Sequence, residues 1–488
     1  MMTTDPWPLT TDHSARPLRV GVFGIGLDTY WPQFAGLHDR LAAQLDRVAR
    51  KLALPGVAVH NAGLVDNPDR ARAAGHEFRA ADVDILFLYV TTYALSSTVL
   101  PVAQIAKVPV VILNLAPAPA IDYAAFNRLP DRVTMTGEWL AHCSACPVPE
   151  IANVFKRARI PFHQVTGTVD DDPAAWREIT EWVEAARVAA AMRDNRLGLM
   201  GSYYGGMLDI YTDLTLQQAV FGTHLEFVEV GQLARLRARF SDADVARRAA
   251  EFSEKFFDVQ PDCAPADIAA AARTSLALDA LADANRLGSL AYYHRNTGVA
   301  ENDEAINTII PGASILTQRH IPVAGEYEVK NAQAMKVMDL FGAGGSFTEY
   351  YALDFAAGHV LMGHDGPGHL AIAEGRTKLR PLRAYHGKTG SGLSVEMSVR
   401  HGPVTLLSVI EENGSLALLT ALGESVPGPI LEIGNTNSRY KFTLPPREFA
   451  NAWNAHGPAH HCAIGTGDVT PRLAKLAALL GIPAHRVC

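Results

Sequence analysis

The N-terminal part of the chain alternates between short, continuously apolar segments and segments whose apolar residues recur at helical spacing. Apolar runs occupy residues 18–23, 84–90 and 108–113, and helical spacing is found over 37–52 and 70–81. Strands that are apolar on both faces and separated by helices are typical of a parallel sheet covered by helices on both sides. The pattern therefore predicts a doubly wound α/β domain.

A similar pattern begins again near Arg196. Residues 197–201 predict a strand that ends in a glycine-rich turn, and residues 214–221 predict the helix that follows. A strand over 225–230 and long helices over 242–257 and 265–287 come next. We therefore expect a second doubly wound domain after the first.

Beyond residue 322 the glycine content rises and alternating strands replace helices. Strands are predicted over 393–399, 404–410 and 416–422. Asn413-Gly414, between the last two, is a strong signal for a two-residue hairpin turn. Residues 355–445 are therefore expected to form a mainly antiparallel, barrel-like β structure.

The predicted fold class is thus α/β, with two doubly wound parallel-sheet domains followed by a mainly antiparallel β, barrel-like, C-terminal domain. A chain of 488 residues is longer than one hydrophobic core usually serves, which agrees with several domains. The predicted boundaries are an N-terminal tail over 1–17, an N-terminal α/β domain over 18–175, a central α/β domain over 176–322 and a C-terminal β-rich domain over 323–488.

The net charge and the lack of a signal-peptide pattern limit the kinds of partner that the sequence predicts. The formal net charge is -8 and no basic run is dense enough to follow a phosphate backbone, so nucleic-acid binding is not expected. Residues 1–8 lack the pattern of a signal peptide, and no apolar run is long enough to span a bilayer. We expect a cytoplasmic protein without a membrane partner.

The chain has five cysteines, an odd and sparse set that favours a reducing compartment. Cys143 and Cys146 form a lone C-x-x-C pair, and with no second pair a zinc site is not expected. We interpret the two as free thiols, with a redox role as the alternative.

Two glutamates and two histidines mark a candidate metal site in the C-terminal half. Glu326 follows a glycine, Glu349 lies between a glycine-rich turn and two tyrosines, and His364 ends a predicted strand; His460-His461 lies far along the chain. A mixed oxygen and nitrogen ligand set suits Mn²⁺, Mg²⁺ or Co²⁺ better than a structural zinc site rich in thiolates.

Each of these residues also has an ordinary structural interpretation. Glu326 precedes a predicted helix and is placed like a first-turn glutamate stabilised by the helix dipole. A histidine at a strand end such as His364 is more often structural, and His460-His461 fits a surface pair. Spacing alone leaves these alternatives open.

Two glycine-containing turns after predicted strands are further candidates for binding loops. Gly24-Ile25-Gly26 lacks the third glycine of a dinucleotide fingerprint, because position 29 is threonine, so a plain turn is favoured. Residues 28–33 would still lie at the carboxyl end of a parallel strand, where ligands gather. The loop over 201–209 fits either a substrate loop or a domain-packing turn, and packing is slightly favoured.

The segments around the two glutamates and the histidines resemble the L-arabinose isomerase/L-fucose isomerase superfamily, and most closely its arabinose-isomerase-like branch. The resemblance covers most of the chain, from about residue 18 to 480. The matching segments are 324–326, 345–350, 363–364, 457–461 and, less specifically, 198–213.

The resemblance implies a ligand set and a pair of catalytic residues. Glu326, Glu349, His364 and His461 would bind the divalent metal, most simply Mn²⁺, with Co²⁺ or Mg²⁺ as alternatives. His461 is preferred to His460 because the second histidine of the pair is the family ligand. Glu326 and Glu349 would also be the catalytic acid and base, in an order that the sequence does not assign.

The resemblance also points to substrate-binding residues in the N-terminal half. His142 stands where the family has a substrate-pocket histidine. Gln33 is a further candidate on separate grounds, because it lies in the loop at the carboxyl end of the first strand, where ligands gather. Trp139 replaces a family glutamine, and residues 27–31 differ from typical arabinose isomerases. The sugar therefore stays open among a pentose, a 6-deoxyhexose and a tetrose.

The implied activity is a metal-dependent aldose–ketose isomerisation of a free, L-arabinose-like sugar through an enediol(ate). The family also implies a homo-oligomer, with a hexamer favoured and a tetramer as the alternative, whose active sites lie at subunit interfaces. The alternative function is a non-catalytic sugar-binding or regulatory protein on the same scaffold. A nicotinamide-dependent oxidoreductase ranks third, because only Gly24-Ile25-Gly26 favours it.

Overall fold

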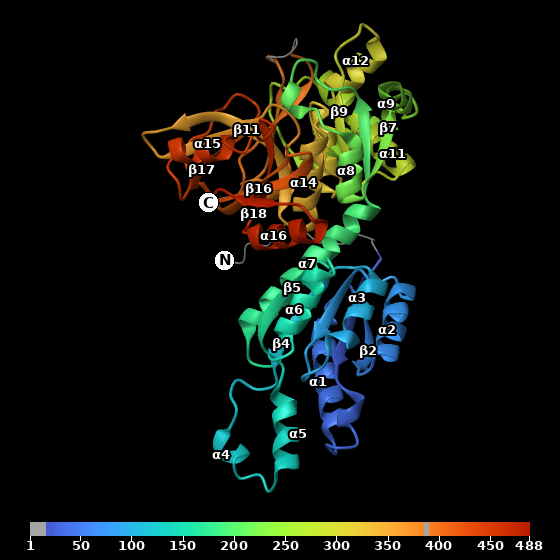
Figure 1. The fold of residues 1–488 in the computed structure, drawn as a ribbon. Helices are drawn as coiled ribbons and strands as arrows, with labels where there is room; N and C mark the ends of the chain where they lie inside the picture. The colour runs from blue at the N-terminus through green and yellow to red at the C-terminus, as the bar shows by residue number, and fades with distance from the viewer. Residues whose placement is uncertain (1–15, 385–389) are drawn as a thin grey trace. The chain divides into compact units, whose positions relative to one another are not determined.

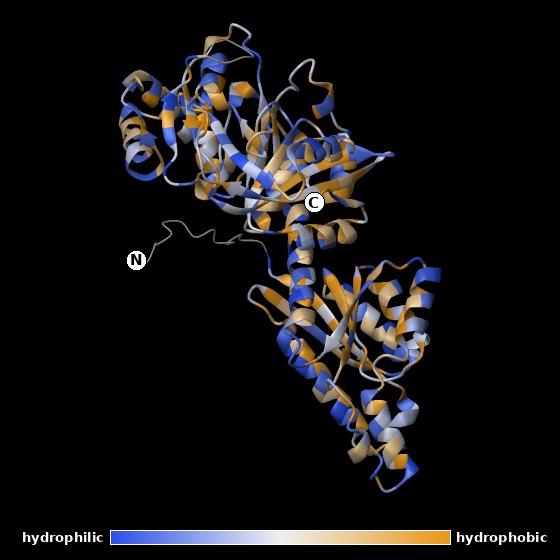
Figure 2. Cartoon of the chain, turned by 90° about the vertical axis from the view of Figure 1, so that its left-hand side faces the viewer, coloured by the Kyte–Doolittle hydropathy of each residue, from blue (hydrophilic) through white to orange (hydrophobic). Residues whose placement is uncertain are grey.

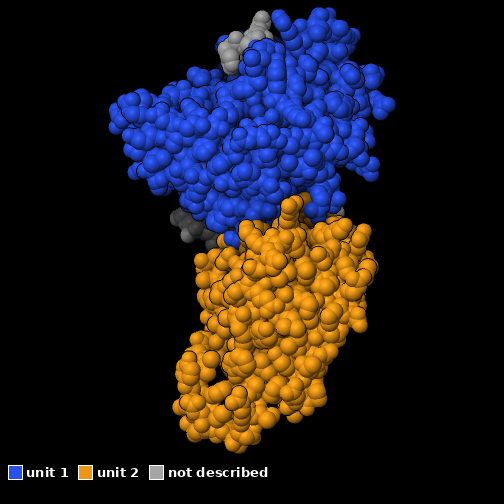
Figure 3. Space-filling model, viewed as in Figure 1, with its two compact units in different colours: residues 1–13, 191–488 blue, residues 14–190 orange. Residues whose placement is uncertain are grey.

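The computed structural model describes residues 16–384 and 390–488. These residues divide into two compact units, shown in orange and blue in Figure 3. We call the described residues up to Ala190 the N-terminal unit and those from Ala191 onward the C-terminal unit. The domain boundary predicted after residue 322 lies within the C-terminal unit and stays a prediction.

The N-terminal unit contains a five-stranded parallel sheet in the order β2-β1-β3-β4-β5 (Figure 1). Its strands are β1 (Leu18–Ile25), β2 (Val57–Val65), β3 (Ile85–Tyr89), β4 (Val110–Ala116) and β5 (Phe162–Thr168). Its helices are α1 (Leu37–Leu52), α2 (Pro68–Ala80), α3 (Leu100–Ala106), α4 (Tyr123–Phe126), α5 (Arg132–His142), α6 (Val148–Arg157) and α7 (Pro173–Asp194), the last of which contains the division between the units.

Burial in this unit follows the sequence pattern. Every residue of β3 is buried, as expected for a strand with helices on both faces. Helix α1 buries Leu41, Leu45 and Val48 on one side and exposes charged residues on the other. In Figure 2 the strands of this sheet are largely hydrophobic, whereas the helices around them carry hydrophilic outer faces. The predicted N-terminal α/β fold is confirmed.

The prediction of free thiols at the C-x-x-C pair is wrong. Cys143 and Cys146 form a disulfide in the turn between α5 and α6. Their Cα atoms are 6.1 Å apart, a separation that a disulfide readily spans. The turn geometry decides the pairing, and the spacing of the two cysteines did not reveal it. Cys263, Cys462 and Cys488 are free.

The C-terminal unit begins with a four-stranded parallel sheet in the order β10-β9-β6-β7. Its strands are β6 (Arg196–Gly201), β7 (His224–Val228), β9 (Ser289–Tyr293) and β10 (Val323–Ala324). The helices in this part are α8 (Leu214–Phe221), α9 (Val230–Arg237), α10 (Asp242–Glu251), α11 (Pro265–Asn285), α12 (Ala300–Asn307), α13 (Ile310–Gln318) and α14 (Val329–Leu340).

A six-stranded antiparallel β-barrel follows, as predicted. The strands pair in the order β15-β18-β11-β12-β17-β16, and pairing between β15 and β16 closes the barrel. They are β11 (Gly344–Asp354), β12 (His359–His364), β15 (Gly402–Glu412), β16 (Ser415–Val426), β17 (Thr436–Phe442) and β18 (His461–Thr466). Helices α15 (Pro446–Asn454) and α16 (Thr470–Leu480) and the short strand β19 (Ala484–Arg486) complete the unit.

The prediction of the hairpin is correct, whereas the predicted range of the barrel is too short. Asn413 and Gly414 have φ angles of 49° and 74°, as a type I′ turn requires, so the hairpin is confirmed. The antiparallel structure extends beyond the predicted 355–445, because β11 and β18 also belong to it. The predicted strand at 393–399 joins a separate three-stranded sheet, composed of β8 (Asp258–Val259), β13 (Lys378–Pro381) and β14 (Leu393–Glu396).

Helix α14 is the central element of the C-terminal unit. All its residues are buried, because it packs against barrel strands β11, β15 and β18 and against β9 and β10 of the parallel sheet. The turn that leads into α14 is thereby held between sheet and barrel. Among the described residues, no helix combines the length and apolar character needed to cross a membrane.

Candidate metal centre

The barrel register brings distant residues of the sequence side by side. Glu349 on β11 is paired with Gly363 on β12 and, on its other side, with His461 on β18. His364 follows Gly363 directly at the end of β12. Three of the predicted metal ligands therefore lie at the same edge of the barrel because of strand pairing.

The fourth predicted ligand, Glu326, lies in a strained turn between β10 and α14. Glu326 and Tyr327 have φ angles of 58° and 62°, a left-handed region that residues other than glycine rarely adopt. The Tyr327 N–H donates to the carbonyl of Tyr292 at 2.9 Å, and the Glu328 N–H donates to that of Gly325 at 3.0 Å. Such strain persists only where the surroundings hold it, and it is concentrated at functional sites.

Glu326, His364 and His461 converge into one buried cluster. One ligand atom from each lies within 4.8 Å of the other two. Glu326 Oε1 is 3.9 Å from His364 Nε2, and Glu326 Oε2 is 3.4 Å from His461 Nε2. The ordinary structural interpretations of the three residues do not explain why two imidazoles and a carboxylate meet away from water.

The donor atoms of this cluster fit a divalent metal ion. Within the described residues, Glu326 Oε2 and His461 Nε2 are buried and make no hydrogen bond, although they lie 3.4 Å apart. A cation between them, with bonds of about 2.0–2.2 Å, would satisfy both atoms. The oxygen and nitrogen donors suit the hard and borderline divalent ions, which agrees with the predicted class of metal.

Glu349 lies beside this cluster and forms a second one. Its carboxylate, with His460 and His461, makes another group whose ligand atoms lie within 4.8 Å of one another. The Glu349 side chain is 24% exposed, whereas that of Glu326 is 8% exposed. Glu349 is therefore on the open side of the centre, next to the buried cluster.

Glu328 is a member of the centre that the sequence analysis missed. Its side chain is 1% exposed, and its Oε2 accepts a hydrogen bond from His461 Nδ1. A carboxylate on one ring nitrogen of a histidine fixes the tautomer and aims the other nitrogen at a metal. The signal in the sequence was a second glutamate two residues after Glu326.

His460 also contacts the centre, on its more exposed side. Its Nδ1 is 2.6 Å from Asp209 Oδ2, and its Nε2 is 3.7 Å from Glu326 Oε2. Burial lowers the pKa of His460, but the carboxylates of Glu326 and Asp209 outweigh burial and raise that pKa to about 9. Asp209 comes from the loop over 202–213. The loop therefore contacts the candidate centre, which the interpretation as a domain-packing turn did not anticipate.

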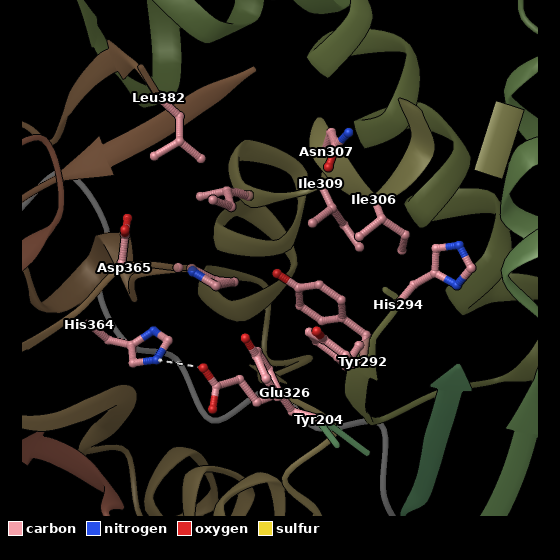
Figure 4. A pocket seen from close by; sticks show the side chains of 15 residues that line it. Tyr204, Tyr292, His294, Ile306, Asn307, Ile309, Glu326, His364, Asp365 and Leu382 are labelled. Atoms are coloured by element: carbon pink, nitrogen blue, oxygen red, sulfur yellow. Dashed lines mark ion pairs between the residues drawn. The ribbon is translucent and has the colours of Figure 1, made fainter. Parts of the chain in front are cut away.

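A pocket opens at the centre (Figure 4). His364 and Glu326 lie in the lower part of the view, joined by the dashed line, and Ile306 and Ile309 lie above and to the right of them. The lining also includes Tyr204 and further aromatic and aliphatic side chains, namely Tyr292, Tyr293, Ile310 and Leu382. Mainly apolar walls with a few convergent polar groups are typical of small-molecule sites.

The predicted substrate residues belong to the N-terminal unit, whereas the centre belongs to the C-terminal unit. Gln33 is exposed and donates to the carbonyl of Thr29 at 2.6 Å. Trp139 is 50% exposed. His142 Nε2 lies 3.2 Å from Glu138 Oε1. Their role in substrate binding stays a prediction.

Comparison with known proteins supports the resemblance seen in the motifs. No family model matches the chain. The chain is 24% identical over 343 residues to a protein described as L-arabinose isomerase, from Aeromonas salmonicida (strain A449). The match covers 67% of this chain and 66% of that relative, just under two thirds of the relative's length.

Proposed function

We propose that this chain, a distant relative of L-arabinose isomerase, is a metal-dependent aldose–ketose isomerase that acts on a free pentose or a related L-arabinose-like sugar. One observation carries the proposal: Glu326 Oε2 and His461 Nε2 are buried, face each other and make no hydrogen bond among the described residues. The distant similarity supports the reaction class.

Four residues would hold the metal: Glu326, Glu349, His364 and His461. Mn²⁺ is our first choice, ahead of Co²⁺ and Mg²⁺. A bound divalent ion would supply Lewis-acid stabilisation of the negative charge that develops on the sugar oxygens. Glu328 would keep the His461 tautomer that presents Nε2 to the ion.

The two glutamates would move the protons of the reaction. In the aldose-to-ketose direction, the hydrogen on C2 leaves as a proton and a proton is added to C1, while the O2 proton is lost and O1 gains one. We assign carbon-to-carbon transfer to one of Glu326 and Glu349 and oxygen-to-oxygen transfer to the other. Glu326 Oε2 makes no hydrogen bond within the described residues, so no described donor competes with the metal and the sugar for its lone pairs.

The pocket walls would orient the sugar and limit water. Tyr204 and Tyr292 stand beside Glu326 in Figure 4, where aromatic faces suit the carbon side of a sugar. Excluding water protects an enediol and strengthens the electrostatic interactions inside the site. The polar ends of the lining, including Asn307 and His294, would contact the hydroxyl groups.

We further propose a homo-oligomer, a hexamer rather than a tetramer, in which the N-terminal unit of a neighbouring copy supplies Gln33, Trp139 and His142. The motivation is that these residues and the metal centre belong to different compact units of the chain. Mixing inactive Glu326→Gln and His142→Ala subunits should then restore activity. Mixed oligomers that stay inactive would contradict shared sites.

Metal removal tests the proposed function directly. Protein stripped with a chelator should lose isomerisation of a panel of aldoses and ketoses with Mn²⁺ omitted, and should regain it when Mn²⁺ or Co²⁺ is added. Glu326→Gln should abolish turnover while the protein keeps its elution volume. Full activity without metal refutes the mechanism, and sugar binding without turnover in the wild type supports a non-catalytic binding protein instead.

A further inference from the structure

A second carboxylate–histidine pair lies beside the metal centre. One oxygen of Asp209, Oδ2, accepts from the backbone N–H of His460 at 2.9 Å and lies 2.6 Å from the ring Nδ1 of the same residue. One carboxylate thus holds both the main chain and the imidazole of His460. This arrangement parallels the Glu328–His461 pair on the neighbouring residue.

Asp209 is itself held in place by α14, the helix that follows the turn containing Glu326. Its carbonyl oxygen accepts from Lys330 Nζ at 2.6 Å, and Lys330 is a buried residue in the first turn of α14. The same loop is anchored by Tyr203, whose ring lies 4.9 Å from that of Tyr327, the residue after Glu326. Asp209 is therefore positioned relative to the centre by two contacts besides its own carboxylate.

The pair directs the second ring nitrogen of His460 at the two proposed catalytic residues. With its Nδ1 hydrogen donated to Asp209, His460 presents Nε2 at 3.7 Å from Glu326 Oε2 and 3.9 Å from Glu349 Oε2. Both distances exceed a hydrogen bond, so a ligand oxygen between these atoms is within reach of all three. The His460 ring lies against that of His461, with centroids 3.8 Å apart and the ring planes tilted by 41°.

Exposure separates the roles of the two adjacent histidines. The His461 side chain is 0% exposed and belongs to the buried cluster with Glu326 and His364, whereas that of His460 is 36% exposed. We propose that His460 contacts the sugar on the open side of the centre and that Asp209 is the positioning residue that orients His460. The proposal rests on the isomerase function proposed above.

The test combines single and double variants with a matched control. Asp209→Ala, Asp209→Asn, His460→Ala and the double alanine variant are compared with Glu412→Ala, which breaks a carboxylate–histidine pair outside the centre, where Glu412 Oε1 is 2.8 Å from His485 Nε2. Two quantities are measured: kcat/KM for the sugar that the wild type isomerises with saturating Mn²⁺, and the Mn²⁺ affinity of metal-free protein without sugar.

We expect Asp209→Ala to lower kcat/KM by roughly 10–100-fold, the usual effect of removing an orienting carboxylate. The double variant should be no worse than His460→Ala, because Asp209 acts through His460. Asp209→Asn, which keeps an oxygen acceptor, should lose less, and Mn²⁺ affinity should be unchanged in all variants. Thermal unfolding checks that each variant is folded. If Asp209→Ala does not fold, Asp209→Asn is compared with the wild type in its place.

Any one of the following results would overturn the proposal. Additive losses in the double variant would show that Asp209 does not act through His460. A parallel fall in Mn²⁺ affinity would make His460 a metal ligand instead of a sugar contact. Wild-type kinetics in Asp209→Ala, with an active wild type, would refute the proposal alone, whereas a wild type that isomerises no sugar refutes the proposed function as well.

Discussion

The most informative prediction concerns Glu328, whose carboxylate lies against His461, one of the proposed metal ligands. Two acidic side chains, Glu326 and Glu328, lie on opposite ring nitrogens of His461, and all three are buried. Glu328→Gln keeps an oxygen acceptor for Nδ1–H and removes one negative charge. The substitution therefore tests the electrostatic role of Glu328 with little change of volume.

The magnitude follows from the role of such carboxylates. Removing the partner of a metal-binding histidine typically weakens metal affinity by about 10–100-fold, or about 1.4–2.7 kcal/mol. In the metal-free protein, the substitution should cost less folding stability than this. The wild type buries two carboxylates against one imidazole, and Glu328→Gln removes one of those two charges. We thus expect Mn²⁺ to stabilise Glu328→Gln less than the wild type, by that same 1.4–2.7 kcal/mol at equal, saturating Mn²⁺.

Calorimetric titration of metal-free protein with Mn²⁺, together with unfolding curves at fixed Mn²⁺, measures both quantities. Glu226→Gln is the matched control, because Glu226 lies 3.3 Å from His224 outside the centre. Unchanged Mn²⁺ affinity in Glu328→Gln would refute the reasoning. So would an equal loss in the control, because the effect would then be independent of the centre.

Two further predictions concern stability and thiol chemistry. Burial lowers the pKa of His369 to about 4 from 6.5, so the unfolded chain gains a proton first as the pH falls. Its contribution to stability should be complete above pH 6.5 and decrease by up to about 3 kcal/mol between pH 6.5 and 4. His369→Gln should remove this part of the pH dependence of unfolding, and an unchanged slope would contradict the assignment. Thiol titration of the denatured, unreduced protein should detect Cys263, Cys462 and Cys488, and reduction should add Cys143 and Cys146; five reactive thiols before reduction would argue against the disulfide.

Elements with a strong local pattern were predicted with their bounds. Helix α1 begins at Leu37 and ends at Leu52, and α8 begins at Leu214 and ends at Phe221, as expected. The hairpin at Asn413 was predicted because its turn residues are adjacent in sequence and adopt positive φ. In each case the interactions that determine the element are made between residues within a few positions of one another.

Strand partners could not be predicted in the same way. The pairing of Glu349 with His461 joins strands that are far apart in the sequence, and the sequence of neither strand indicates which strand it pairs with. The C-x-x-C disulfide was likewise missed, because the turn after α5 decides whether Cys143 and Cys146 face each other.

The sequence by itself determined which residues are candidates for the metal site. Glu326, His364 and His461 were identified from residue type, glycine neighbours and the family resemblance, and the structure brings them together. Only the tertiary structure decided that Glu328 and Asp209 support two adjacent histidines. A lone acidic residue in a loop has no signal of its own, because its role depends on the partner that long-range packing sets against it.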